Sequence, residues 1–524
     1  MIDIGFVGPE FTWKRGNSEA RLDRMLANEE WVTLFPNASM AHLPFFKSDH
    51  RPLLLRLNPE MAINKPNRPF RFIVAWVLHD KFDDFVRQAW NHNTSWVHNI
   101  SQFSDVCSTW NKEVFKHTEL RKKRLLRRLD ELNWVVARFG MEPKYAQLQL
   151  VLWKDLEDVL IQESFIWAQK ARAVWTVYSD RNTHFFHARA NHRKKSQRLE
   201  GIKDDVGSWV YDTVQIKGMA TTFFSHLLSE DITIRLVIHC PMSYPSMNDE
   251  LLRWCGRDVL DRGIKEAIFS MGVLKALGPN GFNALFYHNQ WSTVCAFVVN
   301  YVKFLFANPQ AIREINGTLI VLIPKKDHLE TLGDLRPISL CNVIYKSIMK
   351  IIVSRLKNIL PQVISPNQCS FVPSRHSSDN IIVAQEVIHS MRNMKKKKGF
   401  MAIKIDLEKA YDRVNWQLLF ACLQKLHIPS SLREVIAQCV STPSMQLLWN
   451  GDKAEEFRPS RGVRQGDPLS PYLFVICMEK LAHLIQAAIH EGTWELIRLS
   501  RTGPQISHLF FADDIMLFSE ASMD

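Results

Sequence analysis

The sequence has no long hydrophobic run. The strongest candidate for a membrane span, residues 296–306, is interrupted by Asn300 and Lys303 and falls short of the roughly 20 apolar residues that a spanning helix needs. The first residues include Asp3 and lack the basic stretch that precedes the apolar part of a secretory signal. We therefore expect an intracellular protein without a membrane span. The sequence leaves the compartment open, the nucleus included.

Cysteine is sparse and shows no regular spacing. The nine cysteines are an odd number, and no two of them are spaced as CxxC. Disulfide frameworks and structural zinc sites both need paired, regular spacing. Most of these cysteines have apolar neighbours, so we predict reduced and mostly buried thiols.

Acidic residues are outnumbered by basic ones. The 524 residues include 66 Lys and Arg against 54 Asp and Glu, a net charge of +12. Segment 110–129 carries eight basic and two acidic residues, and 189–203 carries six basic residues and one acidic. A single basic run is often only a solvated helix face. Two such runs in one helical region favour a polyanionic partner, most simply nucleic acid.

The composition and the predicted secondary structure of the chain change at three points. Residues 1–57 contain short strand-like segments and turns, and a Pro- and Asn-rich stretch at 64–69 follows. Residues 58–230 are helical, basic and rich in Trp, whereas 231–305 are mixed. The region 306–524 holds the ordered motifs. We predict four segments with these boundaries.

The first of these motifs is a strand that ends in a carboxylate. In 400–407, apolar Ile403, Ile405 and Leu407 alternate with Ala402, Lys404 and Asp406. This period of two predicts a half-buried strand with Asp406 at its end. The following residues, 408–426, have a helical pattern.

The second motif is HLFFADDIMLF at 508–518. Two β-rich arms flank Asp513 and Asp514, which predicts a hairpin with adjacent acids at its tip. Placing carboxylates together between apolar arms is costly unless a cation neutralises them. Together with Asp406 they could hold two Mg²⁺ ions about 4 Å apart, the arrangement that stabilises attacking and leaving oxygens in phosphoryl transfer.

The third motif, RGVRQGDPLSPYLF, lies between the other two. Gly462 and Gly466 permit close backbone approach, and Ser470 with Pro471 predicts the N-cap and first position of an amphipathic helix. Either QGDP or ADD alone would be read as an ordinary turn. The three motifs in this order favour the active site of a nucleic-acid polymerase.

The ordered motifs resemble those of a known family. IPKKD, LRPISL, QCSFVPSRHSSDNI, IDLEKAYDRVNW, RGVRQGDPLSPYLF and FADD are similar to motifs of non-LTR (LINE-type) retrotransposon reverse transcriptases, particularly those of plants. The resemblance covers about 306–524. It implies an α+β right-hand fold, in which fingers and palm combine an antiparallel sheet with helices. It also implies RNA-directed DNA synthesis with two Mg²⁺ ions.

The resemblance assigns the catalytic carboxylates. Asp406, Asp513 and Asp514 match the family's catalytic acids, and Asp406 and Asp513 are the residues we expect to contact metal. Asp412 and Asp467 also fit the pattern, and we expect them to be structural hydrogen-bond acceptors.

Other matching residues would contact the nucleotide. Tyr411 matches the residue that excludes a ribose 2′-hydroxyl, and Arg375 matches an arginine that neutralises the triphosphate. In this chain Ser374 precedes that arginine, where the family usually has Gly. The remaining candidates are two residues of the template-facing loop and two weaker phosphate ligands: Gln465, Gly466, Lys325 and Arg336.

The N-terminal segment carries a second resemblance. FTW (11–13), RLDR (21–24) and SDHRPLLL (48–55) resemble the end of an apurinic-type endonuclease domain, a partial α/β sandwich of the endonuclease/exonuclease/phosphatase type. This likeness implies that His50 acts on the scissile phosphate, that Asp23 orients its imidazole, and that Asp49 lies near a metal. The family's upstream metal ligands have no counterpart, so we expect no DNA cleavage by this segment.

The leading hypothesis is a LINE-type polyprotein acting on an RNA template, a DNA primer or target, and deoxynucleoside triphosphates. The family's thumb has no counterpart, so we expect a truncated copy that holds primer–template poorly or is inactive. One alternative is an intron-maturase-like reverse transcriptase. The other, from a different class, is a non-catalytic RNA- or DNA-binding protein that uses the basic helices.

Overall fold

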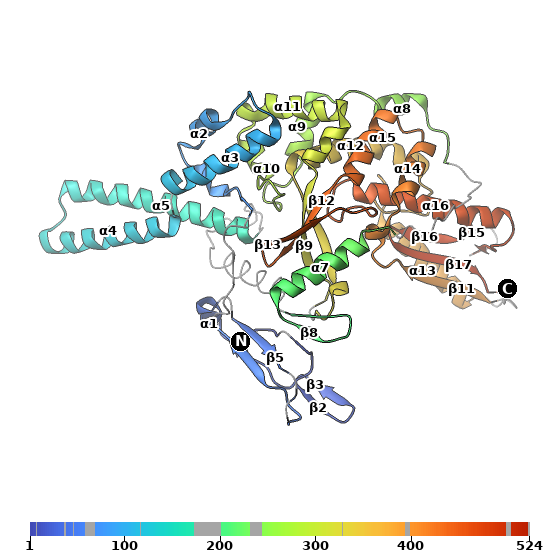
Figure 1. Ribbon diagram of the computed structural model, residues 1–524, viewed down its shortest axis with the longest axis horizontal. Helices are drawn as coiled ribbons and strands as arrows, with labels where there is room; N and C mark the ends of the chain where they lie inside the picture. The colour runs from blue at the N-terminus through green and yellow to red at the C-terminus, as the bar shows by residue number, and fades with distance from the viewer. Residues whose placement is uncertain are drawn as a thin grey trace.

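The computed structural model describes residues 1–6, 8–35, 38–43, 45, 47–57, 69–115, 117–171, 201–230, 244–326, 329–393, 399–498 and 505–521 (Figure 1). Residues 189–200 of the predicted basic run lie outside these ranges. Within them, helices and mainly antiparallel strand pairs occupy separate stretches of the chain, which confirms the α+β class.

A four-stranded sheet lies near the middle of the molecule (Figure 1). Its order is β10 (Leu335–Cys341), β9 (Gly317–Pro324), β12 (Ser444–Trp449), β13 (Asp452–Phe457). β9 pairs antiparallel with β10 and parallel with β12. Helix α7 (Thr213–Leu227) packs Ile216, Ala220 and Phe224 into the apolar cluster formed by this sheet.

A second sheet has three antiparallel strands, in the order β11 (Phe400–Asp406), β17 (Asp514–Glu520), β16 (His508–Phe511). Phe510 and Ile515 belong to the main core, to which α14 (Trp416–Lys425) and α16 (Ser470–His490) also contribute. Leu509 and Phe518 pack instead with Val387 of α13 (Ser377–Asn393). Strands β16 and β17 are therefore covered on both faces, whereas the edge strand β11 is mostly exposed.

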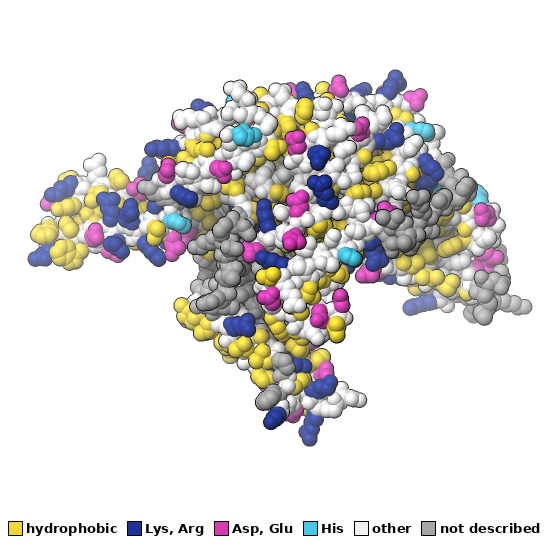
Figure 2. Space-filling view, viewed as in Figure 1, with side chains coloured by type: hydrophobic (Ala, Val, Ile, Leu, Met, Phe, Trp, Pro, Cys, Tyr) yellow, Lys and Arg dark blue, Asp and Glu magenta, His cyan; other side chains and the backbone are white. Residues whose placement is uncertain are grey.

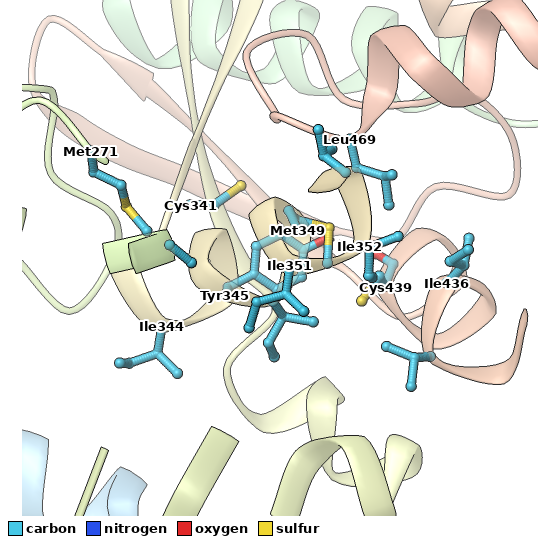
Figure 3. Close-up of a cluster of buried hydrophobic side chains, with 14 of the residues drawn as sticks. Met271, Cys341, Ile344, Tyr345, Met349, Ile351, Ile352, Ile436, Cys439 and Leu469 are labelled. Atoms are coloured by element: carbon cyan, nitrogen blue, oxygen red, sulfur yellow. Dashed lines mark hydrogen bonds between the residues drawn. The ribbon is translucent and has the colours of Figure 1, made fainter. Parts of the chain in front are cut away.

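The main core is helical. Its members are α8 (Asp249–Cys255), α9 (Asp261–Phe269), α10 (Ala284–Asn289), α11 (Trp291–Ala307), α12 (Val343–Val363) and α15 (Ser430–Ser441). Helix α12 is buried on nearly every side, as expected for a central helix. Figure 3 shows its residues Tyr345, Met349 and Ile352 beside Cys439 of α15 and Leu469.

The Trp-rich region 70–115 packs into the same core. This region contains the turn η2 (Val74–Leu78) and helices α2 (Phe82–Ala89) and α3 (Trp96–Trp110). Phe72 and Phe103 pack against Phe282 and Phe286, and Trp76 packs edge-on against Phe72. Residues on both sides of the positions 230/231 and 305/306 contribute to this core. The division into domains stays a prediction.

The basic segment 110–129 is not one helix. Helix α3 ends at Trp110, a π-helical turn covers Asn111–Phe115, and α4 (Thr118–Phe139) begins after it. Helix α4 pairs with α5 (Pro143–Ala171), and this pair projects from the molecule as a long helical hairpin (Figure 1). Most basic residues of α4 lie on its exposed surface.

Residues 1–57 form short strand pairs. These are β1 (Ile2–Asp3) with β4 (Leu26–Ala27), β2 (Trp13–Arg15) with β3 (Ser18–Ala20), and β5 (Ser39–His42) with β6 (Leu53–Arg56), beside helix α1 (Glu29–Leu34). The predicted endonuclease-type sandwich stays a prediction. Two further pairs are β7 (Ile202–Lys203) with β8 (Trp209–Val210), and β14 (Ile497–Arg498) with β15 (Gln505–Ile506).

Three local predictions were wrong. The helix predicted over 408–426 is broken, because Lys409 has a left-handed backbone (φ +52°), a short turn η7 follows at Ala410–Arg413, and α14 begins only after the N-cap Asn415. Ile403 is exposed rather than inward, since β11 is an edge strand. Helix α16 is capped by Leu469, with Ser470 inside the helix.

The cysteine prediction is confirmed within the described part of the chain, where eight cysteines are free and all of these except Cys295 are buried. Of the helices described, only α16 has the length and hydropathy of a membrane span. However, 67% of its apolar window is buried inside the fold, as in a core helix.

Candidate active site

Three carboxylates meet at one end of the three-stranded sheet. Asp406 ends β11 and stands directly opposite Asp514, the first residue of β17. Such directly opposed side chains share a face, with Cβ atoms roughly 4.5–5.5 Å apart. Asp513 lies with Ala512 in the turn between β16 and β17. The predicted hairpin with acids at its tip is confirmed, and it delivers them to Asp406.

This acidic end is open to solvent. Asp406 and Asp514 are exposed and Asp513 is half-buried. The nearest cation to Asp514 is the ammonium of Lys404, whose Nζ lies 3.6 Å from Oδ1. The described residues contain no ready-made cage of three metal-ligating side chains. Mg²⁺ commonly takes only one or two carboxylates and completes its shell with water and substrate phosphates, so opposed carboxylates beside a solvated lysine fit that ion.

The carboxylate-bearing hairpin is braced by residues 367–380, a supporting role that the sequence did not predict. The Phe510 N–H donates to the Asn367 carbonyl (2.8 Å), and the Phe510 carbonyl accepts from Asn380 Nδ2 (3.0 Å). The Ala512 N–H, inside the turn, donates to Oε1 of buried Gln368 (3.2 Å). These bonds fix a turn in which Ala512 has a left-handed backbone (φ +54°). Both Gln368 and Asn380 lie inside the motif QCSFVPSRHSSDNI.

The structure places Arg375 in the same brace. Its guanidinium donates to the carbonyls of Ile364 (2.7 Å), Ser365 (2.5 Å) and Gln368 (2.7 Å). The side chain is half-buried. Glu479 lies nearby and accepts from the Ser365 N–H at 3.0 Å. Arg375 thus ties the supporting segment together in this structure. Its contact with a triphosphate stays a prediction.

Ser374 adopts a conformation that suits glycine better. Its φ is +65°, which costs an L-residue roughly 1–2 kcal/mol. Ser374→Gly should therefore raise the free energy of unfolding by about 0.5–1 kcal/mol, after the extra entropy of glycine in the unfolded chain is subtracted. Urea unfolding measures the change. The control is Ser377→Gly at the start of α13, which should lose stability. A loss in Ser374→Gly as large as in the control would contradict the strain at 374.

Tyr411 and Gln465 lie on neighbouring segments beside the carboxylates. The Tyr411 ring stacks on Phe474 of α16, with centroids 4.6 Å apart. Burial, reinforced by the charge of Asp513, raises the pKa of Tyr411 to about 12. The Gln465 amide donates to Asp412 Oδ2 (2.9 Å), and burial raises the pKa of Asp412 to about 6. As predicted, Asp412 acts as a hydrogen-bond acceptor.

The loop that carries Gln465 and Gly466 is held against β10. The Ser339 N–H donates to the Gln465 carbonyl at 2.8 Å. Gly466 has φ +92°, and a Cβ there would lie 3.3 Å from Ile338 and from the Ser339 carbonyl. Asp467 accepts from the Leu469 N–H (3.0 Å) at the start of α16, which confirms its predicted structural role. The loop therefore joins β10 to the turn η7 and to the start of α16.

Lys325 and Arg336 lie on the β9–β10 pair. Lys325 follows β9 directly, and Arg336 lies on β10 opposite Ile323. Both side chains are exposed. Both cations are therefore accessible to solvent, whereas the guanidinium of Arg375 is hydrogen-bonded to backbone carbonyls of the chain itself. None of these placements tests the predicted phosphate contacts.

Comparison with known proteins agrees with this geometry. A family profile described as reverse transcriptase (RNA-dependent DNA polymerase) matches residues 323–524. Residues 323–524 form a reverse transcriptase domain. An uncharacterised 149 kDa protein of transposon TX1 from Xenopus laevis is 23% identical over 97% of this chain and 39% of its own length. The Pol polyprotein of the type-2 retrotransposable element R2DM from Drosophila melanogaster is 27% identical over 47% of this chain and 22% of its own length.

Beyond this domain the chain is similar to proteins of transposable elements, and it spans well under half the length of either relative. An uncharacterised mitochondrial protein of Arabidopsis thaliana is 52% identical over 68 residues, which is 13% of this chain and 56% of that protein. The resemblance to plant sequences is thus matched over a short segment by this Arabidopsis thaliana protein.

The reverse transcriptase domain is pinned internally by buried Arg464, which sequence reasoning missed. Its guanidinium donates to Asn316 Oδ1 (2.7 Å), Thr318 Oγ1 (2.9 Å) and the Cys439 carbonyl (2.9 Å). It also donates to the Tyr345 hydroxyl and lies 3.4 Å from Asp467 Oδ2. One side chain thereby joins the loop after Gly462 to β9, α12 and α15. The sequence around Arg464 contains no pattern that indicates these partners.

The N-terminal segment brings together two of its three predicted residues. His50 Nδ1 lies 2.7 Å from Asp23 Oδ2, the predicted pair. Asp49 instead accepts from the Trp13 indole N–H at 3.0 Å. The Thr12 hydroxyl oxygen accepts from the Leu22 and Asp23 N–H groups, which positions the carboxylate. The geometry suits an oriented imidazole, and its role in phosphate chemistry stays a prediction.

The hydrogen bond to Asp23 raises the pKa of His50 above its ordinary value. Because the folded-state pKa is raised, the pair stabilises the fold fully below the unfolded pKa of about 6.5, and this contribution disappears as pH rises through the folded pKa. Asp23→Asn should return the His50 pKa towards 6.5, as measured by NMR titration of the imidazole. Asp49→Asn is the control and should shift it less. Equal shifts in both variants would contradict a specific Asp23–His50 bond.

Proposed function

We propose that this chain is an RNA-directed DNA polymerase of a LINE-type element, which extends a DNA primer on an RNA template by two-metal nucleotidyl transfer. The observation that carries the proposal is the meeting of Asp406, Asp513 and Asp514 at one end of the three-stranded sheet. That sheet corresponds to the palm of a right-hand polymerase, and the β9–β10 pair corresponds to the fingers.

The open carboxylates suit a pair of Mg²⁺ ions, with Asp406 and Asp513 as the proposed ligands. Bound there, the ions would lower the cost of negative charge on the attacking and leaving oxygens. The chain's own part is to hold the carboxylates in place: the Gln368 amide and the Asn367 and Asn380 contacts fix the hairpin turn. Because these supports are largely buried, the turn is positioned before any substrate arrives.

Tyr411 is the proposed selector of deoxyribose over ribose. Its ring is held flat against Phe474, so it cannot swing away from a bulkier sugar without losing that stacking. The loop at Gln465 and Gly466 would lie against the base pair being formed. Its bonds to Asp412 and Ser339 support a fixed position for it.

Primer extension on an RNA template tests the proposal. A polymerase produces DNA in Mg²⁺ and deoxynucleoside triphosphates. The alternative of a non-catalytic nucleic-acid-binding protein predicts template binding that weakens steeply with salt, without any extension. That alternative is favoured by the exposed basic residues of α4.

A further inference from the structure

The free end of the α4–α5 hairpin carries a cluster of exposed apolar side chains, which we call the hairpin-end patch. Figure 2 shows hydrophobic side chains gathered at this end, which projects from the molecule in Figure 1. Six side chains within residues 134–153, all more than half exposed, define the patch: Trp134, Phe139, Met141, Leu150, Val151 and Trp153. Single exposed apolar side chains are ordinary, whereas a cluster of this size usually marks an interaction site.

The hairpin does not need these side chains for its own packing. Its buried core consists of Leu129 and Leu132 of α4 and Leu152 of α5. Leu150 and Trp153 are three residues apart, so they share a side of α5 that α4 leaves exposed. Because the patch is not used inside the hairpin, burying it against a partner would be favourable.

Charged side chains at the hairpin end are few, and each already has a contact within the hairpin. Residues 134–153 contain only Arg138, Glu142 and Lys144. The Arg138 guanidinium lies over the Trp134 ring (5.3 Å), and Lys144 Nζ lies 2.7 Å from Glu142 Oε2. The dense basic run of α4 lies closer to the base of the hairpin. The patch therefore does not suit a polyanion, and an apolar partner would leave no charge buried without a partner.

The size of the patch is close to one side of a protein–protein interface. Aromatic side chains bury about 150–250 Å² each, so six large apolar side chains at more than half exposure present on the order of 600 Å² per copy. A stable interface buries roughly 800 Å² on each partner, part of it from polar atoms around the rim. Two antiparallel helices also have a shape that a second, identical pair can cover around a two-fold axis, as in four-helix bundles.

We propose that the hairpin-end patch is a self-association surface, at which the α4–α5 hairpins of two copies pack side by side around a two-fold axis. A second copy is the occupant that this surface favours, because an apolar patch with its few charges already in contact is complementary to itself. Each copy would contribute Leu150 and Trp153 to a shared four-helix core. The inference goes beyond the proposed function, since the pairing of two hairpins requires neither metal nor template.

Sedimentation velocity of the full chain, treated with nuclease, tests the pairing. A species of twice the 60.9 kDa chain mass should grow with concentration across the micromolar range and should persist at high salt. Leu150→Glu places a carboxylate in the shared core from both copies, so it should weaken the dimer at least about tenfold. Leu150→Met keeps an apolar side chain of similar volume and should stay within about threefold of the unchanged chain.

The matched control is Leu120→Glu. Leu120 belongs to the same hairpin and is equally exposed, 64% against 62% for Leu150, but it lies near the base, roughly 28 Å along α4 from Phe139. This variant should change the dimer affinity less than about twofold. A circular dichroism melt shows whether Leu150→Glu is folded, and Trp153→Glu, with the same expected loss, takes its place if it is not.

A chain that stays monomeric at every concentration would overturn the proposal. So would a dimer that survives both Leu150→Glu and Trp153→Glu, an equal loss in Leu120→Glu, or growth into species larger than a dimer, which indicates a contact that does not close. A dimer that disappears after nuclease treatment or at high salt would show that nucleic acid links the copies, and it too would contradict the patch. None of these outcomes depends on primer extension, so failure here leaves the proposed function untouched.

Discussion

Asp406→Asn is expected to reduce RNA-templated primer extension by about 10²–10³-fold, the usual cost in rate of losing a single preorganised electrostatic group at a reacting centre. Asn keeps the size of the side chain but removes the charge that faces Asp514 across the β11–β17 pair. The fold should survive, because Asp406 is exposed and ends an edge strand. Extension rates at saturating Mg²⁺ measure the effect.

The matched control is Asp452→Asn. This carboxylate begins β13 on the other sheet and pairs with Lys217 at 3.2 Å, so its loss should leave extension within about twofold. Equal losses in both variants would point to a general effect on the fold. Normal primer extension by Asp406→Asn would show that Asp406 takes no part in catalysis.

Arg464→Met is expected to lower the free energy of unfolding by about 3–5 kcal/mol, the usual cost of removing one partner from a buried ion pair. The side chains of Arg464 and Asp467 are only 6% and 4% exposed. Met would leave buried Asp467 without its cationic partner, whereas the Cys439 carbonyl would keep its bonds from Asn316 Nδ2 (3.1 Å) and the Tyr345 hydroxyl (3.2 Å). Because the guanidinium reaches β9, α12 and α15 at once, the loss should be cooperative. The midpoint of urea unfolding records it.

Arg413→Met is the companion variant, since Arg413 is 52% exposed and lies 3.7 Å from Glu408. An exposed pair of this kind contributes at most about 1 kcal/mol. If Arg464→Met unfolds at the same urea concentration as Arg413→Met, the buried network contributes little. Restoring stability with Arg464→Met combined with Asp467→Leu would show that the unpaired carboxylate causes the loss.

The three carboxylates could be predicted because their signal is local. Alternation along 400–406 ends in Asp406, and two apolar arms around Asp513 and Asp514 specify a hairpin; neither depends on distant partners. The break after Asp406 was missed, since residues 408–426 have good helical spacing. Only the Asn415 cap, which accepts from the Leu418 N–H at 2.8 Å, signals where α14 begins.

The supports of the site could not be predicted, because their partners lie far away in sequence. Gln368 reaches Ala512 across 144 residues, and Arg464 reaches Asn316 across 148. Arg375 is a different case, because its partners lie only 7 to 11 residues before it in the chain. Its match to a family arginine suggested phosphate, whereas folding surrounds its guanidinium with the carbonyls of Ile364, Ser365 and Gln368.

Incorporation of a single labelled deoxynucleotide opposite an RNA template, by the full chain in Mg²⁺, tests the central claim most directly when Asp513→Asn is assayed beside it. The arrangement of Asp406, Asp513 and Asp514 predicts a primer longer by one nucleotide, absent without divalent metal and absent from Asp513→Asn. Template binding without incorporation, or equal incorporation by Asp513→Asn, would contradict it.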